Sequence, residues 1–130
     1  MILGISNVDG ILVALFDKNR EKIAEKKSDG RDLLREISKL LTGENISPEN
    51  IQKIFVVNGP GKFTAMREIC VISNFLAAET GAELFPILAD DFEKSGRNFS
   101  PFFEKKIAPQ KKILPIFAGA PRIGKLKKAA

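Results

Sequence analysis

The sequence predicts an α/β fold: a single lobe on a mixed sheet, with an N-terminal antiparallel meander and two main helices. Three observations predict it. Two apolar runs joined by a tight turn open the chain, a leucine-rich stretch follows with helical spacing, and residues 51–87 run as strand, turn, helix and strand. The last unit is a parallel crossover, which needs roughly 30 residues. The length of 130 residues suits one domain with a real core.

The meander is predicted from the first 27 residues. Residues 2–6 and 11–16 are apolar runs, and the Asp-Gly pair between them is a good hairpin signal. Residues 17–20 form a second turn, and residues 21–27 form a third, more polar strand. Its lysines suit the edge of a sheet, because charged edge strands discourage pairing with another chain.

A first helix follows the meander, beginning at a cap on Ser28 or Asp29 and ending at Gly43. Its apolar residues recur at the spacing of one helical face, and they are Leu33, Leu34, Ile37, Leu40 and Leu41. A Ser-Pro pair ending at Pro48 then predicts a single helical turn before a strand over residues 54–58.

The second helix, over about residues 64–80 and closed by Gly81, carries two apolar stripes. The denser stripe comprises Met66, Ile69, Cys70, Ser73, Leu76 and Ala77. The other lies roughly opposite, beside Arg67 and Asn74, and comprises Val71, Phe75 and Ala78. A helix that is apolar on most sides is normally buried on most sides. The second stripe therefore needs a cover, which is either more of the same chain or another subunit.

The pattern continues with a short strand over residues 84–87 and then weakens. It predicts a short helix over 88–94, a loop over 95–101 and a last short strand over 113–117. Pro115 argues against a central position for that last strand, because proline cannot donate a hydrogen bond to a neighbouring strand.

Charge divides the chain into a lobe and a tail. Residues 105–130 hold eight basic and no acidic residues, whereas residues 1–104 hold the other 13 basic and all 16 acidic residues. We expect a lobe over 1–104 and a basic extended tail over 105–130. Such a tail either contacts nucleic acid or an acidic partner, or it is a solvated terminus.

Residue types that catalysis commonly uses are missing or isolated. The chain has no histidine, which excludes a histidine triad or a histidine metal site. Its one cysteine, Cys70, lies on the denser stripe and indicates a buried structural thiol. Asp90 and Asp91 are adjacent on a predicted helix, so they point about 100° apart and suit one metal ion poorly. We therefore expect a protein that is not an enzyme and has no metal or other cofactor.

The cell compartment follows from two further observations. A single cysteine cannot form an intramolecular disulfide, which fits a reducing cytoplasm. The N-terminus enters a strand pattern directly, and no apolar run is long enough to span a membrane. We expect a cytoplasmic protein without a membrane contact.

The turn Gly59-Pro60-Gly61-Lys62 stands between a strand and a helix, where backbone amides can bind an anion. The spacing does not match a P-loop, because Phe63 occupies the position of the required Ser or Thr. The turn is therefore either structural or an anion site. In the second case the chain is a small phosphate- or nucleotide-binding protein.

Residues 58–67 resemble the TsaB (YeaZ) family, whose signature here is Gly-Pro-Gly-Ser-Phe-Thr-Gly-Leu-Arg. Six residues match: Gly59, Pro60, Gly61, Phe63, Thr64 and Arg67. Lys62 replaces Ser, Ala65 replaces Gly and Met66 replaces Leu. The resemblance covers residues 1–88 well and residues 113–128 loosely.

The resemblance implies a ribonuclease-H-like lobe of the actin-like ATPase type. Family members are non-catalytic subunits in the synthesis of threonylcarbamoyladenosine, beside the tRNA anticodon. They dock on the catalytic TsaD subunit, are joined by the TsaE ATPase and otherwise form homodimers. The implied partner interface here comprises Phe63, Arg67, Val71, Phe75 and Ala78, and the basic tail would contact tRNA.

The chain also departs from the family pattern. Family members are usually two-lobed, so this chain resembles a minimal form that lacks most of the second lobe. Nucleotide-binding relatives end the first strand with Asp, where Ser6 or Asn7 stands here. Both departures argue against nucleotide hydrolysis.

Overall fold

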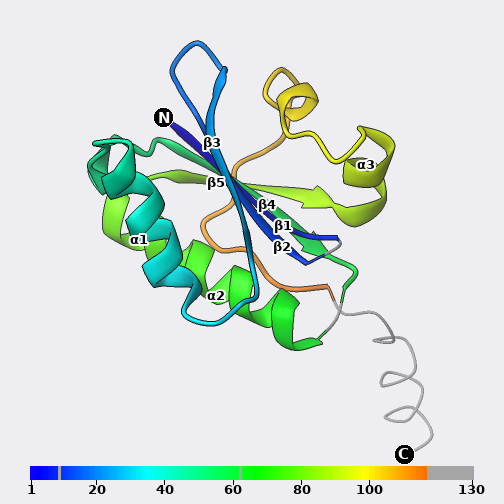
Figure 1. Ribbon diagram of the computed structural model, residues 1–130. Coiled ribbons are helices and arrows are strands. Elements are labelled where there is room, and N and C mark those ends of the chain that lie inside the picture. Colours follow the sequence, from blue (N-terminus) through cyan, green and yellow to red (C-terminus); the bar gives the residue numbers. More distant parts are fainter. Residues whose placement is uncertain (9, 62, 117–130) are drawn as a thin grey trace, which may run out of the picture.

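The fold is a five-stranded mixed sheet with helices on both faces (Figure 1). The computed structural model describes residues 1–8, 10–61 and 63–116, apart from the side chain of Phe63. The strands are β1 (Ile2–Asn7), β2 (Ile11–Phe16), β3 (Lys22–Ser28), β4 (Lys53–Gly59) and β5 (Glu83–Leu88). The helices are α1 (Leu33–Gly43), α2 (Phe63–Thr80) and α3 (Ala89–Lys94), with 3₁₀ turns η1 (Pro48–Asn50) and η2 (Ser100–Phe102).

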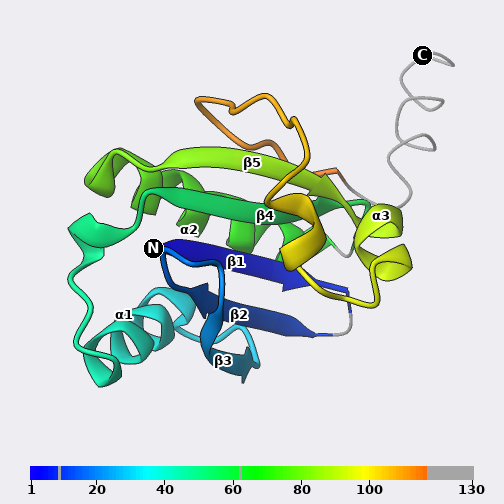
Figure 2. The ribbon, with the colours of Figure 1, turned by 90° about the horizontal axis from the view of Figure 1, so that it is seen from above.

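The strand order β3-β2-β1-β4-β5 confirms both the meander and the crossover. β2 pairs with β1 and β3 in antiparallel fashion, and β4 pairs with β1 and β5 in parallel (Figure 2). The charged strand β3 lies at an edge, as its lysines predict. α2 connects β4 to β5 and returns the chain to the same end of the sheet, as a parallel pair requires.

Different elements pack on the two faces of the sheet, because successive side chains of each strand point to opposite faces. α1 and α2 cover one face, and their buried aliphatic residues meet Leu3, Ile5 and Val56. α3 and η2 lie on the other face, where the core is rich in phenylalanine (Figures 1 and 2). The aliphatic face therefore carries the helices that the leucine spacing predicts.

The phenylalanine core closes the second face of the sheet. The rings are Phe16, Phe55, Phe85, Phe92, Phe99, Phe102 and Phe103. Phe16 and Phe103 meet edge to face with centroids 4.9 Å apart, and Phe55 stacks on Phe85 at 4.8 Å. Phe99 packs so closely on Gly4 that a Cβ at this glycine would lie 2.8 Å from the ring. Residues 89–103 thus cover the face that α1 and α2 leave open.

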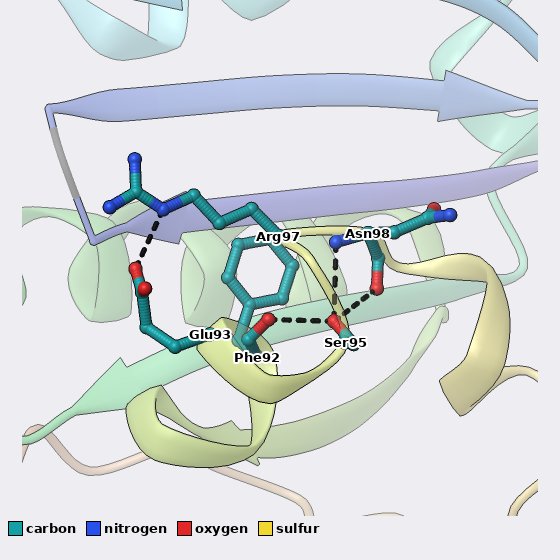
Figure 3. Close-up of polar contacts among 5 residues, drawn as sticks. All are labelled: Phe92, Glu93, Ser95, Arg97 and Asn98. Atoms are coloured by element: carbon teal, nitrogen blue, oxygen red, sulfur yellow. Dashed lines mark hydrogen bonds and ion pairs between the residues drawn. The ribbon is translucent and has the colours of Figure 1, made fainter.

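A loop after α3 is closed by polar contacts among Phe92, Glu93, Ser95, Arg97 and Asn98 (Figure 3). The Ser95 hydroxyl lies 2.6 Å from the Phe92 carbonyl and 2.9 Å from the Asn98 carbonyl, and it accepts the Asn98 N–H at 3.2 Å. Arg97 donates to Glu93 at 2.6 Å. These contacts turn the chain back toward the sheet directly before Phe99.

The predicted start of the first helix is wrong. α1 begins at Leu33 after Asp32, which has a left-handed backbone (φ 52°) and makes no capping hydrogen bond with its side chain. Ser28 instead accepts the Gly30 N–H at 3.0 Å, and Asp29 accepts the Arg31 N–H at 2.9 Å. Short polar side chains bond local backbone amides in turns as readily as at caps, so both residues close turns before the helix.

The strand predicted over 113–117 does not form in its described part, residues 113–116. β1 and β5 pair with most of β4, and the segment bonds only the end of that strand, where the Asn58 carbonyl accepts the Ile116 N–H at 2.8 Å. The Asn74 side chain binds the N–H and the carbonyl of Ile113 instead. Residues 110–116, hereafter the C-terminal strap, begin at an isolated bridge between Gln110 and Leu84 of β5 and then run beside α2 and across the end of β4 without forming a strand. Residue 117 lies outside the described residues.

Candidate functional site

α2 presents two faces, as its two stripes predict. Met66, Ile69 and Ser73 are fully buried against the sheet, and the rest of the denser stripe is buried or half-buried. On the outer side Val71 is 57% exposed and Phe75 is 48% exposed. Ala78 is exposed as well. Val71, Phe75 and Ala78, hereafter the exposed stripe, are thus left uncovered by the described residues of the chain.

Arg67 lies at the start of this stripe and is exposed. It makes no ion pair within the part of the chain that the structure describes. Beside it, a hollow of about 370 Å³ is lined by Thr64, Arg67, Glu68, Val71 and Ile72. The first two turns of α2 therefore offer a recess next to protruding apolar side chains.

A larger hollow of about 550 Å³ adjoins the first turn of α2. It lies between the β1–β2 turn at Asn7 and Gly10, the loop 28–31 and the start of α2. Thr64 and Glu68 line both hollows, so the two are neighbours across Glu68. The charge pattern of the sequence alone does not single out Glu68.

The glycine turn at the end of β4 is engaged by the C-terminal strap. Gly59 has φ 119°, which favours glycine, and a Cβ there would clash with the Ile116 carbonyl oxygen. The Gly59–Pro60 peptide is cis. Gly61 donates its N–H to the same Ile116 oxygen at 3.1 Å. This amide is occupied while the strap is in place, and Lys62 lies outside the described residues.

Two asparagines hold the strap, and the sequence did not point to this role. Asn74 accepts the Ile113 N–H at 2.8 Å and donates to the Ile113 carbonyl at 2.9 Å. Asn58 donates its side-chain amide to the Leu114 carbonyl at 2.9 Å, and its own carbonyl accepts the Ile116 N–H at 2.8 Å. The sequence offered two signals for this role. Asn74 is a polar residue beside the apolar stripe of α2, and Asn58 is a polar residue at the end of an apolar strand.

The strap also contributes apolar surface. Ile113 is buried in the aliphatic core, whereas Leu114 is 65% exposed. Asn74 lies three residues after Val71 and four before Ala78, so it shares their side of α2. The strap therefore runs next to the exposed stripe. The division of the chain at residue 104 stays a prediction, but the described residues of the tail contact the lobe as far as Ile116.

The remaining candidates have no reactive arrangement. Burial raises the pKa of the Cys70 thiol to about 11, as expected for a structural thiol. Asp90 and Asp91 are exposed on α3. The described residues contain no group of three or more side chains suited to hold a metal ion. None of the described helices combines the length and apolar character that crossing a membrane requires.

Comparison with known proteins supports the fold. No protein-family model matches the sequence, and no curated protein matches it. Among solved structures, YeaZ from Pseudomonas aeruginosa matches with a TM-score of 0.58 and 18% identity, covering 73% of this chain and 49% of that chain. An uncharacterized protein similar to the peptidase YEAZ, also from P. aeruginosa, matches with a TM-score of 0.58 and 17% identity, over the same shares of the two chains.

At these identities the likeness concerns the fold alone. The expected single lobe is confirmed as an α/β fold shared with YeaZ, and the chain spans about half the length of the matched structures.

Proposed function

We propose that this chain is a non-catalytic scaffold subunit that docks a TsaD-like enzyme in the threonylcarbamoyladenosine modification of tRNA. Three observations support the proposal. The motif at residues 58–67 resembles that of the TsaB family, the lobe has the YeaZ fold, and α2 carries an uncovered apolar stripe. The match covers only 49% of the YeaZ chain, so the role of the whole protein is carried over here as a proposal.

The exposed stripe is the observation that most directly supports docking of a partner on α2. Fully burying a Val or Phe side chain is worth about 1.5–3 kcal/mol, and roughly half of each side chain is still exposed here. Covering Val71 and Phe75 would therefore contribute about 1.5–3 kcal/mol to binding. Soluble proteins seldom leave clustered large apolar side chains uncovered, and such clusters often mark interaction surfaces.

The other proposed interface residues have supporting roles. Arg67, exposed at the start of the stripe, would pair with a carboxylate of the partner. Phe63 is proposed as a contact by its place in the motif, and its side chain lies outside the described residues. Gly59, Pro60 and Gly61 would fix where α2 begins.

The same surface would serve other associations. Without the TsaD-like enzyme, the stripe would pair with a second copy of the chain. A TsaE-like ATPase would join the assembled pair, and the basic residues of 105–130 would contact tRNA.

The test is light scattering on the eluting species, for the full chain alone and mixed with a TsaD-like enzyme from the same source. We expect a 1:1 complex. The variant Val71→Asp, Phe75→Asp, Ala78→Asp should lose it, because three carboxylates cannot be desolvated against an apolar partner.

Leu88→Asp is the matched control, since Leu88 is also about half exposed but lies at the end of β5. It should bind like the parent chain. Equal affinity of the triple variant and this control, with both folded by circular dichroism, would remove the stripe from the interface.

A further inference from the structure

The exposed large apolar side chains of the described residues gather on two neighbouring segments. Six such side chains are at least 37% exposed, and four of them lie on α2 and the C-terminal strap: Val71, Phe75, Leu114 and Ile116. The other two, Ile23 and Leu88, lie on β3 and β5. Such gathering of large apolar side chains often marks an interaction surface. The strap is therefore a candidate for the same surface as the exposed stripe.

Hydrogen bonds fix the strap beside the exposed stripe (Figure 1). Asn74, which shares the side of α2 with the stripe, binds the N–H and the carbonyl of Ile113 at 2.8 and 2.9 Å. The Asn58 side chain binds the Leu114 carbonyl at 2.9 Å. Ile113 is 1% exposed and the next residue, Leu114, is 65% exposed, so the two side chains point to opposite sides of the strap. The same bonds that bury Ile113 thus present Leu114 to solvent next to α2.

Two basic residues border this surface without a partner of their own. Arg67 on α2 and Lys112 on the strap are exposed and make no ion pair with a described residue. Glu68 and Glu79 lie about 100–120° around α2 from Arg67, on the side of the stripe that faces away from Asn74. Glu83 borders the surface only at the C-terminal end of α2. Charge complementarity therefore favours a partner with carboxylates on the side of the strap.

We propose that Leu114 and Ile116 belong to the same docking surface as the exposed stripe, and that Asn74 is the residue that positions them there. The inference rests on the function proposed above and specifies its docking surface. The occupant is the TsaD-like enzyme, through a surface with an apolar centre and with carboxylates facing Arg67 and Lys112. RNA would use the basic residues alone, whereas the adjacent large apolar side chains favour a protein.

The first test measures the affinity of the full chain for the TsaD-like enzyme by isothermal titration calorimetry. Leu114→Asp should weaken binding at least about fivefold, because a large apolar contact is lost and a carboxylate is buried in its place. Ile23→Asp is the matched control, since Ile23 is exposed on β3 at the opposite edge of the sheet from β5. It should bind like the parent chain. Equal affinities of the two variants, with both folded by circular dichroism, would remove the strap from the surface.

A double-mutant cycle tests the positioning role of Asn74. Asn74→Ala releases the backbone of Ile113 and should weaken binding about as much as Leu114→Asp does. In the Leu114→Asp chain the same change should weaken binding by less than about twofold, because the contact that it disturbs is already lost. A purely structural Asn74 would lower the affinity of both chains by the same factor, and that result would overturn the positioning role.

Charge variants test the chemistry of the occupant. Arg67→Glu, Lys112→Glu should weaken binding to the enzyme about twofold to tenfold, and the effect should shrink as salt is added. Lys26→Glu, Lys27→Glu makes the same change of charge on β3 and should leave the affinity unchanged. Equal effects of the two double variants, or a loss of tRNA binding without a loss of enzyme binding, would overturn the choice of an acidic protein surface.

The outcomes separate this inference from the proposed function. If the triple variant of the exposed stripe loses the enzyme and Leu114→Asp keeps it, the docking function stands and the strap is not part of the surface. A parent chain that does not bind the enzyme would overturn both. A dimer of the chain that persists in the mixture with the enzyme would overturn the choice of the enzyme as occupant.

Discussion

Replacing Asn74 by Ala tests whether the C-terminal strap is held by α2. The substitution removes the two hydrogen bonds between the Asn74 amide and the backbone of Ile113, of 2.8 and 2.9 Å. At about 1 kcal/mol net for each bond, the direct cost is about 2 kcal/mol of unfolding free energy. If the strap stays in place, the unpaired N–H and carbonyl of Ile113 add a penalty of about 1–3 kcal/mol.

The strap has an alternative response, which is to detach. Detachment frees both backbone groups to bond water, but the net gain of the two bonds is still lost, and Ile113, now 1% exposed, becomes exposed at a further cost of about 1.5–3 kcal/mol. The two responses therefore cost about the same. We expect Asn74→Ala to lower the free energy of unfolding by about 3–5 kcal/mol, with local opening of the strap.

Urea unfolding measures the loss of stability, and native-state hydrogen exchange at the Ile113 and Ile116 amides measures the opening. Asn50→Ala is the control, since Asn50 is exposed and makes no side-chain hydrogen bond among the described residues. Equal midpoints for the two variants, together with unchanged exchange at Ile113, would refute the role given to Asn74.

Two further predictions concern the packed interior. Gly4→Ala should destabilise the fold by about 1–3 kcal/mol, because its Cβ would lie 2.8 Å from the Phe99 ring. Gly43→Ala is the control and should be close to neutral, because no atom lies within 4 Å of the added Cβ. Similar melting temperatures for the two variants would contradict the packing of Phe99 on Gly4. Cys70, whose pKa is raised from 9.0 to about 11 by burial, should stay a thiol in the folded chain well above pH 9. As the pH rises, the thiol ionises in the unfolded chain before it does so in the folded chain, so the free energy of unfolding should fall between pH 9 and 11. The measurement is the free energy of unfolding of the parent minus that of Cys70→Ala, and a difference that does not change over this pH range would contradict the burial of the thiol.

Local sequence patterns determined most of the elements of this fold. Alternating and helical apolar spacing depends on neighbours along the chain, so the meander, α1, α2 and the crossover could be predicted without their partners. The two stripes of α2 could be predicted in the same way, and the structure buries one and exposes the other. The positions of Val71 and Phe75 on the helix surface follow from its period alone.

Competing local interactions limited the prediction at α1. Ser28 and Asp29 have the chemistry of helix caps, but the same side chains also close turns. The backbone path from β3 into the helix decides between the two uses, and it places the helix start at Leu33.

Tertiary structure alone decided what lies on the second face of the sheet and what holds the strap. Phe92, Phe99 and Phe103 have no regular spacing, and only the folded chain gathers them over Phe16 and Phe55. Residues 113–116 have the composition of a strand, but strand formation needs a continuous row of open backbone groups, and this segment is held instead by the side chains of Asn74 and Asn58 and by single backbone bonds at Asn58 and Gly61. Contacts between residues 39 positions apart leave no periodic trace in the sequence, because their geometry exists only after the chain has folded.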